Sequence, residues 1–238
     1  MKTTGKGTLY LLPVPLTEGK PSASLPVSTL EIILSLQIFI VEDIRSARRF
    51  LRVAGYSGDF QDITFHVLNE HVNAAAIPEM LKETIQGTNT GLLSEAGMPC
   101  IADPGALVVT YAHQQKVKVV PLIGPSSILL ALMASGFNGQ HFIFHGYLPV
   151  KSVERSAKIK EIESQVYRLN QTQIFIETPY RNLNLFSGLM ETCKDQTLLC
   201  IACNLNAPDE LIINKPVSWW KNNAPEIHKK PAVFLLYR

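Results

Sequence analysis

Short apolar runs alternate with longer stretches of helical periodicity along almost the whole chain, and no other feature limits its possible folds as strongly. Apolar runs bounded by turn residues are typical of strands, and helices between successive strands favour parallel pairing. The sequence therefore predicts an α/β fold with mostly parallel sheets. The expected strands are residues 8–12, 38–42, 64–68, 91–94, 117–122, 142–145, 173–177, 198–203, 210–213 and 232–237. The expected helices between the early strands are residues 29–36, 46–54, 77–86, 104–115 and 126–135.

The composition is that of a folded protein without a strong overall charge. Hydrophobic residues make up 46% of the 238 positions, which is too rich for a disordered chain. The formal net charge of +2 gives no strong overall attraction to nucleic acid or membranes, so any basic site has to be local. The best apolar run, residues 32–41, is about half as long as a membrane span requires. We therefore expect no membrane association.

Two of the four cysteines, Cys200 and Cys203, form a C-x-x-C pair within an apolar run. If this run is a strand, a spacing of three places the two thiols on opposite faces, which suits neither a redox motif nor a zinc site. The histidines have no metal-binding spacing either. We expect the pair to be small buried residues, with no metal, in a protein of the reducing cytoplasm.

Glycine and proline gather in three loops that follow expected strands, at residues 13–15, 94–105 and 124–127. Folds with parallel strands place their functional loops at the carboxyl ends of those strands. Glycine lets the backbone approach a ligand closely, and proline keeps a loop rigid. One such loop would be an ordinary turn, but three together favour a ligand cleft lined by main-chain groups. The signatures of dinucleotide-binding loops, P-loops and α/β-hydrolase nucleophiles are absent.

A row of arginines follows the second expected strand. Arg45, Arg48, Arg49 and Arg52 are spaced so that they share one face of a helix, while apolar residues occupy another face. Like charges at this spacing destabilise a helix slightly, and phosphate oxygens would relieve the repulsion. An anionic partner and a solvated face with acidic neighbours are equally good explanations.

Further cationic residues follow two later strands: Lys151 and Arg155 after one, and Arg181 after the next. Together with the arginine row they could line a cleft for a polyanion. Trp219 and Trp220 are expected to pack against the last strand rather than to stack on bases.

The loop residues resemble motifs of the tetrapyrrole (corrin and porphyrin) methylase superfamily, most closely the branch typified by ribosomal RNA small-subunit methyltransferase I. Residues 9–15 resemble its opening strand and Pro-x-Pro turn, and residues 42–45 resemble its acidic helix start with a following arginine. Residues 66–70 resemble a loop that ends in Asn-Glu, and residues 94–105 resemble its most specific Gly/Pro motif. Residues 123–127, 147–155 and 176–181 resemble later motifs, and all of them occur in the family's order.

The resemblance implies two α/β domains, residues 1–120 and 121–238, with a cofactor cleft between them, and a homodimer. It also implies a methyltransferase that holds S-adenosylmethionine mainly through the backbone of the Gly/Pro loops. The residues carried over as cofactor-binding are Pro13, Ser94, Glu95, Ala96, Gly97, Pro99, Asp103, Ser126, Ser127 and Glu177. The residues expected to contact the substrate are Arg48, Arg49, Lys151, Arg155 and Arg181.

Several positions on the substrate side depart from the branch pattern. Residues 16–26 are longer than the family's turn, Ile44 replaces a threonine, Leu68 replaces a histidine, and residues 203–210 lack the family's lysine. Three functions therefore stay open. They are ribose 2′-O-methylation of small-subunit ribosomal RNA, methylation of a small tetrapyrrole-like ring, and binding of S-adenosylmethionine without turnover. The arginine row and the branch resemblance favour the first.

Acidic residues at strand ends are candidates for assisting the loss of a hydroxyl proton during methyl transfer. Asp43 is the first choice, with Arg45 orienting it or holding a phosphate, although helix capping explains Asp43 equally well. Glu70 and Asp103 are further candidates, but Glu70 is better explained as an exposed loop residue. His66 is better explained by a structural hydrogen bond.

Overall fold

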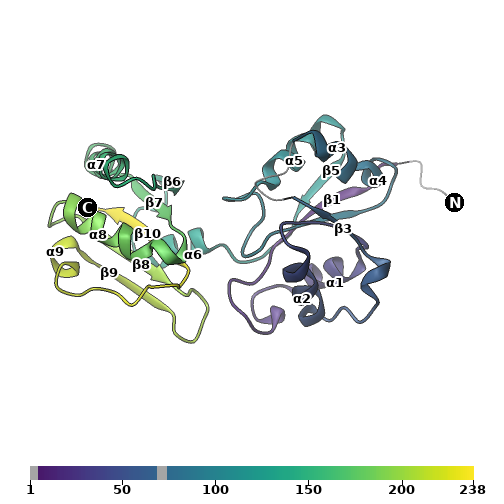
Figure 1. Cartoon of the computed structure of the whole chain (residues 1–238), viewed down its shortest axis with the longest axis horizontal. Coiled ribbons are helices and arrows are strands. Elements are labelled where there is room, and N and C mark those ends of the chain that lie inside the picture. Colours follow the sequence, from purple (N-terminus) through teal and green to yellow (C-terminus); the bar gives the residue numbers. More distant parts are fainter. Residues whose placement is uncertain (1–4, 69–73) are drawn as a thin grey trace. The chain divides into compact units, whose positions relative to one another are not determined.

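The computed structural model describes residues 5–68 and 74–238, which form two compact units. The described residues up to Ser126 make the first unit and Ser127–Arg238 make the second, whereas the sequence analysis placed this boundary after position 120. Each unit contains one five-stranded sheet with helices packed against it (Figure 1). The predicted α/β class is confirmed.

The first unit is built on a fully parallel sheet. Its strands are β1 (Thr8–Leu12), β2 (Ile38–Val41), β3 (Thr64–Val67), β4 (Thr90–Leu93) and β5 (Lys118–Pro121). They lie in the order β3-β2-β4-β1-β5, and every neighbouring pair is parallel, as the sequence predicts. This order places the carboxyl ends of β4, β1 and β5 side by side, so the three Gly/Pro loops leave one edge of the sheet together.

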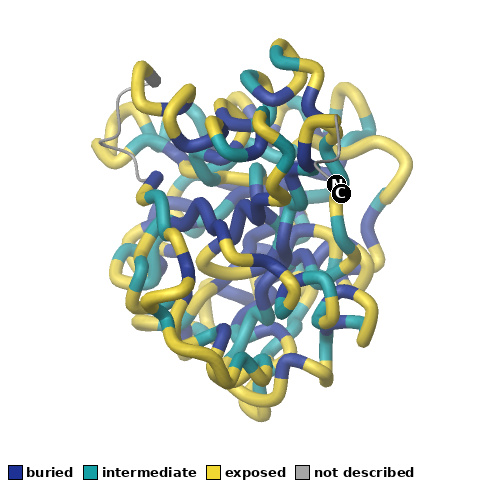
Figure 2. Tube along the Cα trace, turned by 90° about the vertical axis from the view of Figure 1, so that its right-hand side faces the viewer, coloured by how far each residue is buried: buried dark blue, intermediate teal, exposed yellow. Residues whose placement is uncertain are grey.

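Helices cover both faces of the first sheet because its strands alternate apolar side chains between two cores. Leu12, Phe39 and Val41 face one core with the helices α1 and α2, whereas Leu9 and Ile40 face the other with α3, α4 and α5. Figure 1 shows the two groups of helices on opposite faces of this sheet, and the tube in Figure 2 is coloured by the burial of each residue. These helices are α1 (Val27–Ser35), α2 (Ile44–Ala54), α3 (Ile77–Met80), α4 (Lys82–Ile85) and α5 (Gly105–Gln114). Short 3-10 turns are η1 (Pro21–Ala23), η2 (Phe60–Asp62) and η3 (Ala74–Ala76).

The second sheet departs from the expectation of mostly parallel strands. Its strands are β6 (Phe142–Tyr147), β7 (Thr172–Ile176), β8 (Leu198–Cys203), β9 (Leu211–Pro216) and β10 (Ala232–Tyr237), in the order β6-β7-β10-β8-β9. Only β6 and β7 pair in parallel, and the other three pairs are antiparallel. A parallel crossover needs a connecting helix, but only residues 204–210 join β8 to β9. These strands therefore form a hairpin.

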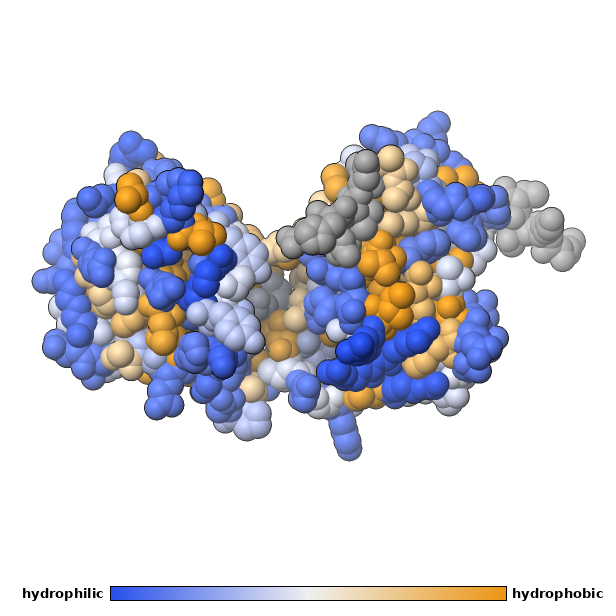
Figure 3. Space-filling model, viewed as in Figure 1, coloured by the Kyte–Doolittle hydropathy of each residue, from blue (hydrophilic) through white to orange (hydrophobic). Residues whose placement is uncertain are grey.

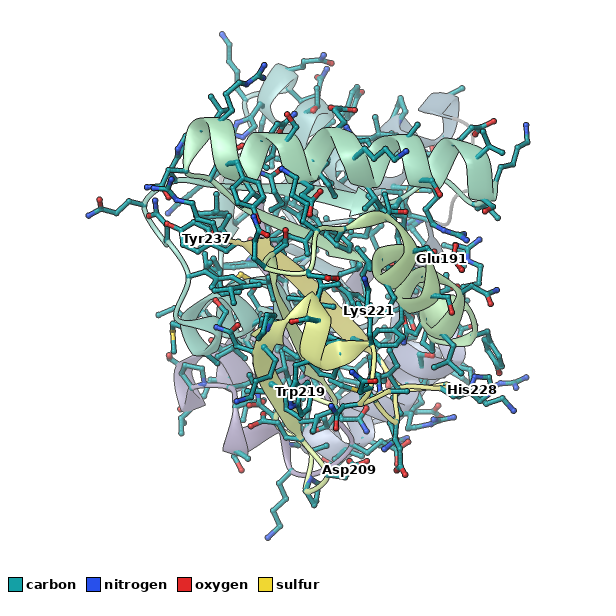
Figure 4. All side chains as sticks on the ribbon, turned by 90° about the vertical axis from the view of Figure 1, so that its left-hand side faces the viewer. Glu191, Asp209, Trp219, Lys221, His228 and Tyr237 are labelled. Atoms are coloured by element: carbon teal, nitrogen blue, oxygen red, sulfur yellow. The ribbon has the colours of Figure 1, made fainter. Side chains whose placement is uncertain are left out.

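The helices of the second unit are α6 (Ser127–Ser135), α7 (Ser152–Leu169), α8 (Asn182–Thr192) and α9 (Val217–Trp220), with a 3-10 turn η4 (Pro179–Arg181). Helices α7, α8 and α9 cover one face of the sheet, and α6 packs against β8, β9 and β10. Trp220 is buried and its Nε1 donates to the Leu199 carbonyl at 2.9 Å, so it packs on the sheet. Figure 4 shows its neighbour Trp219 on the same short helix.

The C-x-x-C pair lies on β8 as predicted. Cys203 belongs to the core beneath α7 and α8, while Cys200 is buried but lies outside that core, as opposite faces require. Burial raises the pKa of the Cys200 thiol to about 12, so it is protonated and unreactive at neutral pH. Across residues 5–68 and 74–238, no group of three or more His, Cys, Asp or Glu side chains could hold a metal ion. Within the same residues, no helix is long and apolar enough to cross a membrane.

Candidate active site

The loops after β1 and β4 are joined directly to each other. Leu12 and Leu93 are register partners at the ends of their strands, so Pro13 and Ser94 leave the sheet side by side. Further along the two loops, Val14 and Gly97 exchange two backbone hydrogen bonds of 2.9 Å each. Gly97 has a φ of +74°, a conformation that glycine adopts without strain. The glycine therefore allows the two loops to close into one main-chain structure.

Asp103 fixes the shape of the loop after β4. Its carboxylate accepts hydrogen bonds from the backbone N–H of Cys100 at 2.9 Å and of Gly105 at 2.8 Å. Cys100 and Ala102 both have positive φ angles, of 69° and 64°, which are unfavourable for residues with a side chain. Such backbone strain clusters at functional sites, where surrounding contacts hold it in place. Asp103 supplies those contacts here, so its carboxylate shapes the loop.

The third Gly/Pro loop packs against the first. The Leu122 N–H donates to the Leu11 carbonyl at 3.0 Å, and the Thr29 hydroxyl donates to the Ile123 carbonyl at 3.1 Å. A Cβ atom at Gly124 would lie 2.3 Å from the Cβ of Pro13, a distance that no side chain tolerates. Position 124 has to be glycine for this close approach. All three loops are thus held together at the carboxyl edge of the first sheet.

The structure gathers most of the residues predicted to bind the cofactor. Pro13, Ser94, Gly97 and Pro99 are buried at this edge, Glu95 and Ala96 are exposed beside them, and Asp103 is half-buried. Ser126 is buried at the end of the first unit. Ser127, which begins α6, and Glu177, which follows β7, belong to the second unit.

Glu42 is a further acidic residue at this edge. The sequence predicts no catalytic or binding role for it, only a position next to the arginine row. It directly follows β2 and lines a small cavity of about 10 Å³ together with Asp103 and Pro99. Burial raises the pKa of Glu42 above its usual value, and the carboxylates of Asp103 and Glu95 raise it further. Its position immediately after a central strand is the signal that could have identified it.

Asp43, the first-choice catalytic residue, caps helix α2. Its Oδ1 accepts a hydrogen bond of 2.8 Å from the backbone N–H of Ser46, and this bond lowers the pKa of the exposed Asp43 carboxyl. Arg45 is exposed in the first turn of the same helix. Glu70 lies outside the described residues. His66 is half-buried with its Nε2 4.0 Å from a carboxylate oxygen of Glu83, and this Nε2 has no hydrogen-bond partner among the described residues, so the expected structural hydrogen bond is not found there.

The arginine row divides into two pairs that have different neighbours. Arg48 lies over the rings of Phe60 and Phe65, and Arg52 lies 4.3 Å from the ring centre of Phe60. Arg45 and Arg49 are exposed on the same helix. Among the described residues, no acidic side chain forms an ion pair within 4 Å of these four guanidiniums. Asp43 at the start of α2 nevertheless interacts electrostatically with Arg45, so both explanations of the row stay open.

The second unit holds a buried carboxylate just after β7. Glu177 Oε1 accepts hydrogen bonds from the Thr178 N–H at 2.7 Å and from two nitrogens of Arg181, at 2.9 and 2.6 Å. Its other oxygen, Oε2, is buried and has no partner among the described residues. A buried carboxylate oxygen without a donor is unfavourable unless a ligand supplies one. Arg181, predicted to contact substrate, is occupied by this pair.

The two other predicted substrate contacts of the second unit flank the start of α7. Lys151 is exposed and pairs with Glu154 at 3.3 Å. Arg155 Nη1 donates to the Val150 carbonyl at 3.0 Å, while its buried Nε has no partner in the part of the chain that is described. In the loop that lacks the family's lysine, Asp209 accepts hydrogen bonds from Asn204 at 2.8 Å and Lys230 at 3.1 Å.

Solved structures with the same fold are methyltransferases of tetrapyrrole synthesis. The methyltransferase CobJ superposes with a TM-score of 0.65 at 14% sequence identity, covering 99% of this chain and 95% of its own. The precorrin-6Y methylase CbiE from Archaeoglobus fulgidus gives a TM-score of 0.59 at 15% identity, covering 99% of both chains. At these identities the likeness shows the fold alone.

Relatives by sequence are more specific. The ribosomal RNA small subunit methyltransferase I of Vibrio cholerae is 31% identical over 214 residues, which is 90% of this chain and 70% of the relative. The protein of the same name from Escherichia coli O157:H7 is 30% identical, covering 89% of this chain and 70% of its own. A third, from Streptococcus pyogenes, is 30% identical and is covered over 64% of its length. No family model matches the chain. The two longer matches nevertheless show that the chain belongs to the ribosomal RNA small subunit methyltransferase I family of methyltransferases.

Proposed function

We propose that the protein transfers a methyl group from S-adenosylmethionine to a ribose 2′-hydroxyl of small-subunit ribosomal RNA. The observation that carries this proposal is the joined pair of loops at Val14 and Gly97, in a chain whose relatives carry the name of a ribosomal RNA methyltransferase. Ribosomal subunits are cytoplasmic, so the proposal places the protein in the cytoplasm.

The chemistry of the carboxyl edge fits this methyl donor. When bound, S-adenosylmethionine supplies a methyl group on a positively charged sulfur. The loops of the first unit offer rigid main-chain groups around Gly97 and carboxylates at Glu42, Glu95 and Asp103, and anionic groups favour a cation nearby. The unpartnered Oε2 of Glu177, in the second unit, is an acceptor that a hydroxyl or amino group of a ligand could satisfy. The roles of Ser126 and Ser127 in holding it remain predictions.

Glu42 is better suited than Asp43 to accept the hydroxyl proton. A general base works best when its pKa lies near the operating pH, and the pKa of Glu42 is raised while that of Asp43 is lowered. The Asp43 carboxylate is also the N-terminal cap of α2. We therefore assign proton acceptance to Glu42, and capping to Asp43. Arg45 is then free to hold a phosphate.

The exposed arginines of α2 support an RNA substrate. Arg45 and Arg49 are exposed guanidiniums on the helix that follows β2, and each can bind a phosphate through two hydrogen bonds. Arg48 is held over two aromatic rings and adds its charge to the same face. Lys151 and Arg155 of the second unit remain predicted RNA contacts of that unit. This predicts RNA affinity that falls steeply with salt.

A small tetrapyrrole-like ring is the second candidate substrate. The observation in its favour is the loop at residues 203–210, where Asp209 and its partners occupy the region that carries a lysine in the family pattern. A ring substrate would need an apolar binding surface as well, and the names of the relatives by sequence weigh against it.

The direct test is the transfer of tritiated methyl groups to three acceptors in parallel. These are small ribosomal subunits that lack the modification, total RNA, and porphyrinogens. We expect label in the small-subunit RNA, at a position that resists alkaline cleavage because the 2′-hydroxyl is blocked. Label in the porphyrinogens alone would favour the second candidate. Donor binding without transfer to any acceptor would favour a binding module.

The proposed assembly is a homodimer. Strand β6 lies at an edge of the second sheet, and it carries the exposed apolar side chains Phe142, Ile143 and Tyr147. An exposed edge with apolar side chains is a surface that proteins usually cover. Light scattering after size-exclusion chromatography would give twice the chain mass for this assembly, and the chain mass alone would contradict it.

A further inference from the structure

The first unit contains a pocket of about 620 Å³ whose lining includes Arg49, predicted to contact the substrate, and Glu95 and Ala96, predicted to contact the cofactor. It lies between the loop after β1, helix α2 and the beginning of the loop after β4. Leu16, Phe50 and Val53 provide apolar walls, whereas Lys20 and Arg49 bring positive charge to it. Pockets of this size with apolar walls and a few charged groups are typical of small-molecule sites.

We propose that this pocket receives one unstacked nucleotide of the substrate RNA. Phe50 offers a ring to a base face, and Lys20 and Arg49 offer cations to the adjoining phosphate. Glu18 and Glu95, which also line the pocket, can accept hydrogen bonds from exocyclic amino groups or from a ribose hydroxyl. A nucleotide is a ligand that combines a flat apolar face, an anion and several donors. The inference rests on the proposed function and names a substrate subsite for it.

The position of the pocket along α2 favours RNA over the methyl donor. Arg49 lines the pocket, and Arg45 continues the same charged face one turn earlier, so the site adjoins a track for backbone phosphates. Figure 3 shows strongly hydrophilic side chains gathered beside hydrophobic ones over α2. Of the loop after β4, only Glu95 and Ala96 reach the pocket, and Gly124 of the third loop does not line it. The pocket therefore adjoins the loops assigned to the donor at Val14, Glu95 and Ala96, and extends from them along α2.

Two matched valines allow a test that does not disturb the core. Val53 is 55% exposed on α2 and lines the pocket, while Val27 is 68% exposed at the start of α1 and does not. The probes are the four ribonucleoside 5′-monophosphates and their nucleosides, titrated into the full chain and followed by NMR. Val53→Asp puts a carboxylate against the bound base and phosphate, so we expect affinity for the monophosphates to fall about tenfold or more. Val27→Asp should leave that affinity unchanged.

A second variant reports on the phosphate. Arg49→Gln should weaken binding of a monophosphate and leave the weaker binding of the matching nucleoside unaffected, because only the former carries the anion. If Arg49→Gln instead weakened binding of the monophosphate and of the nucleoside equally, the variant would only have destabilised the pocket. That result would overturn the assignment of Arg49. Thermal melting of each variant checks that it is folded.

The inference and the proposed function can fail separately. If no monophosphate binds the wild-type chain, or if Val53→Asp and Val27→Asp behave alike, the pocket is not a nucleotide site, even if methyl transfer to RNA is observed. If Val53→Asp abolishes S-adenosylmethionine binding in calorimetry and the monophosphates compete with it, the pocket belongs to the donor and the inference is overturned. Nucleotide binding without any methyl transfer would instead contradict the proposed function.

Discussion

Val14 and Gly97 exchange backbone hydrogen bonds in both directions, at 2.9 Å each, and so join the loops after two neighbouring parallel strands. The link depends on the φ of +74° at Gly97. It places the main chain of both loops at one edge of the first sheet, where Ser94, Glu95 and Asp103 also lie. The proposed binding of the methyl donor depends on the hydrogen bonds between Val14 and Gly97.

Gly97→Ala tests the link between the loops. A side chain at this φ costs about 1 kcal/mol, and the new Cβ would lie 3.2 Å from a methyl group of Leu16. We expect a lower melting temperature and an affinity for S-adenosylmethionine reduced about tenfold or more, measured by calorimetry. The control is Gly136→Ala, which has a φ of +72° with no atom within 4 Å of the added Cβ. It should show a similar loss of stability with unchanged affinity, and equal effects on affinity would contradict the assignment.

Glu42→Gln and Asp43→Asn separate the two candidate bases. Removing the proton acceptor should lower kcat by about a hundredfold or more, and should remove the loss of activity at low pH that its titration causes. Because the pKa of Glu42 is raised, that loss should occur above the usual range of a carboxyl group. Asn also caps helices well, so Asp43→Asn should keep most of the activity. A large loss in Asp43→Asn alone would return the role to Asp43.

The pH dependence of stability provides an independent check on Glu42. The folded state binds the Glu42 proton more tightly than the unfolded state, because the folded pKa lies above the usual value of 4.5. The stability that this adds is fully present below pH 4.5 and is lost as the pH rises through the folded pKa. Urea unfolding of wild type and Glu42→Gln across this window should show the fall only in wild type. Parallel curves would show that the carboxyl is not perturbed.

The exposed arginines should control the salt dependence of RNA binding. Each lost contact with a single-stranded phosphate flattens the plot of log affinity against log salt by about 0.7, so Arg45→Gln with Arg49→Gln should flatten it by about 1.4. The matched control is Lys82→Gln with Lys118→Gln, which removes the same charge from exposed positions of the same unit. If both double variants have the same slope, the effect is one of net charge and not of this helix.

The C-x-x-C pair should be chemically inert. Cys200 is buried and its pKa is raised to about 12, and burial also raises the pKa of Cys203. Iodoacetamide at pH 8 should leave both thiols unmodified in the native protein and modify both in urea, as mass spectrometry can show. Cys200→Ala with Cys203→Ala should keep the affinity for S-adenosylmethionine. Rapid native labelling, or loss of that affinity, would show that the pair has a function.

Much of the first unit follows from local sequence pattern. Apolar runs with helical stretches between them identify all five of its strands, and β1 begins and ends at the predicted residues Thr8 and Leu12. The expected helix 77–86 is two short helices, separated at Leu81. The antiparallel pairing of strands in the second sheet was harder to predict from the sequence. It depends on the short link of residues 204–210 and on the position of β10 between β7 and β8. Strand order is set by packing between distant segments, which periodicity does not encode.

The candidate site was predicted in part. Glycine and proline identify the loops, because their backbone preferences are local and visible at Gly97 and Pro13. Glu42 was harder to recognise, because its pKa is raised first by burial and then by Asp103 and Glu95, and both the burial and these neighbours come from segments far away in sequence. The same holds for Arg48, whose aromatic neighbours Phe60 and Phe65 meet it only in the fold.

Calorimetric titration of S-adenosylmethionine into the wild-type chain tests the central claim most directly. The account predicts saturable heat with one site per chain, and binding of the demethylated product S-adenosylhomocysteine to the same site. Absence of heat with both compounds, under conditions where the protein is folded, would contradict it.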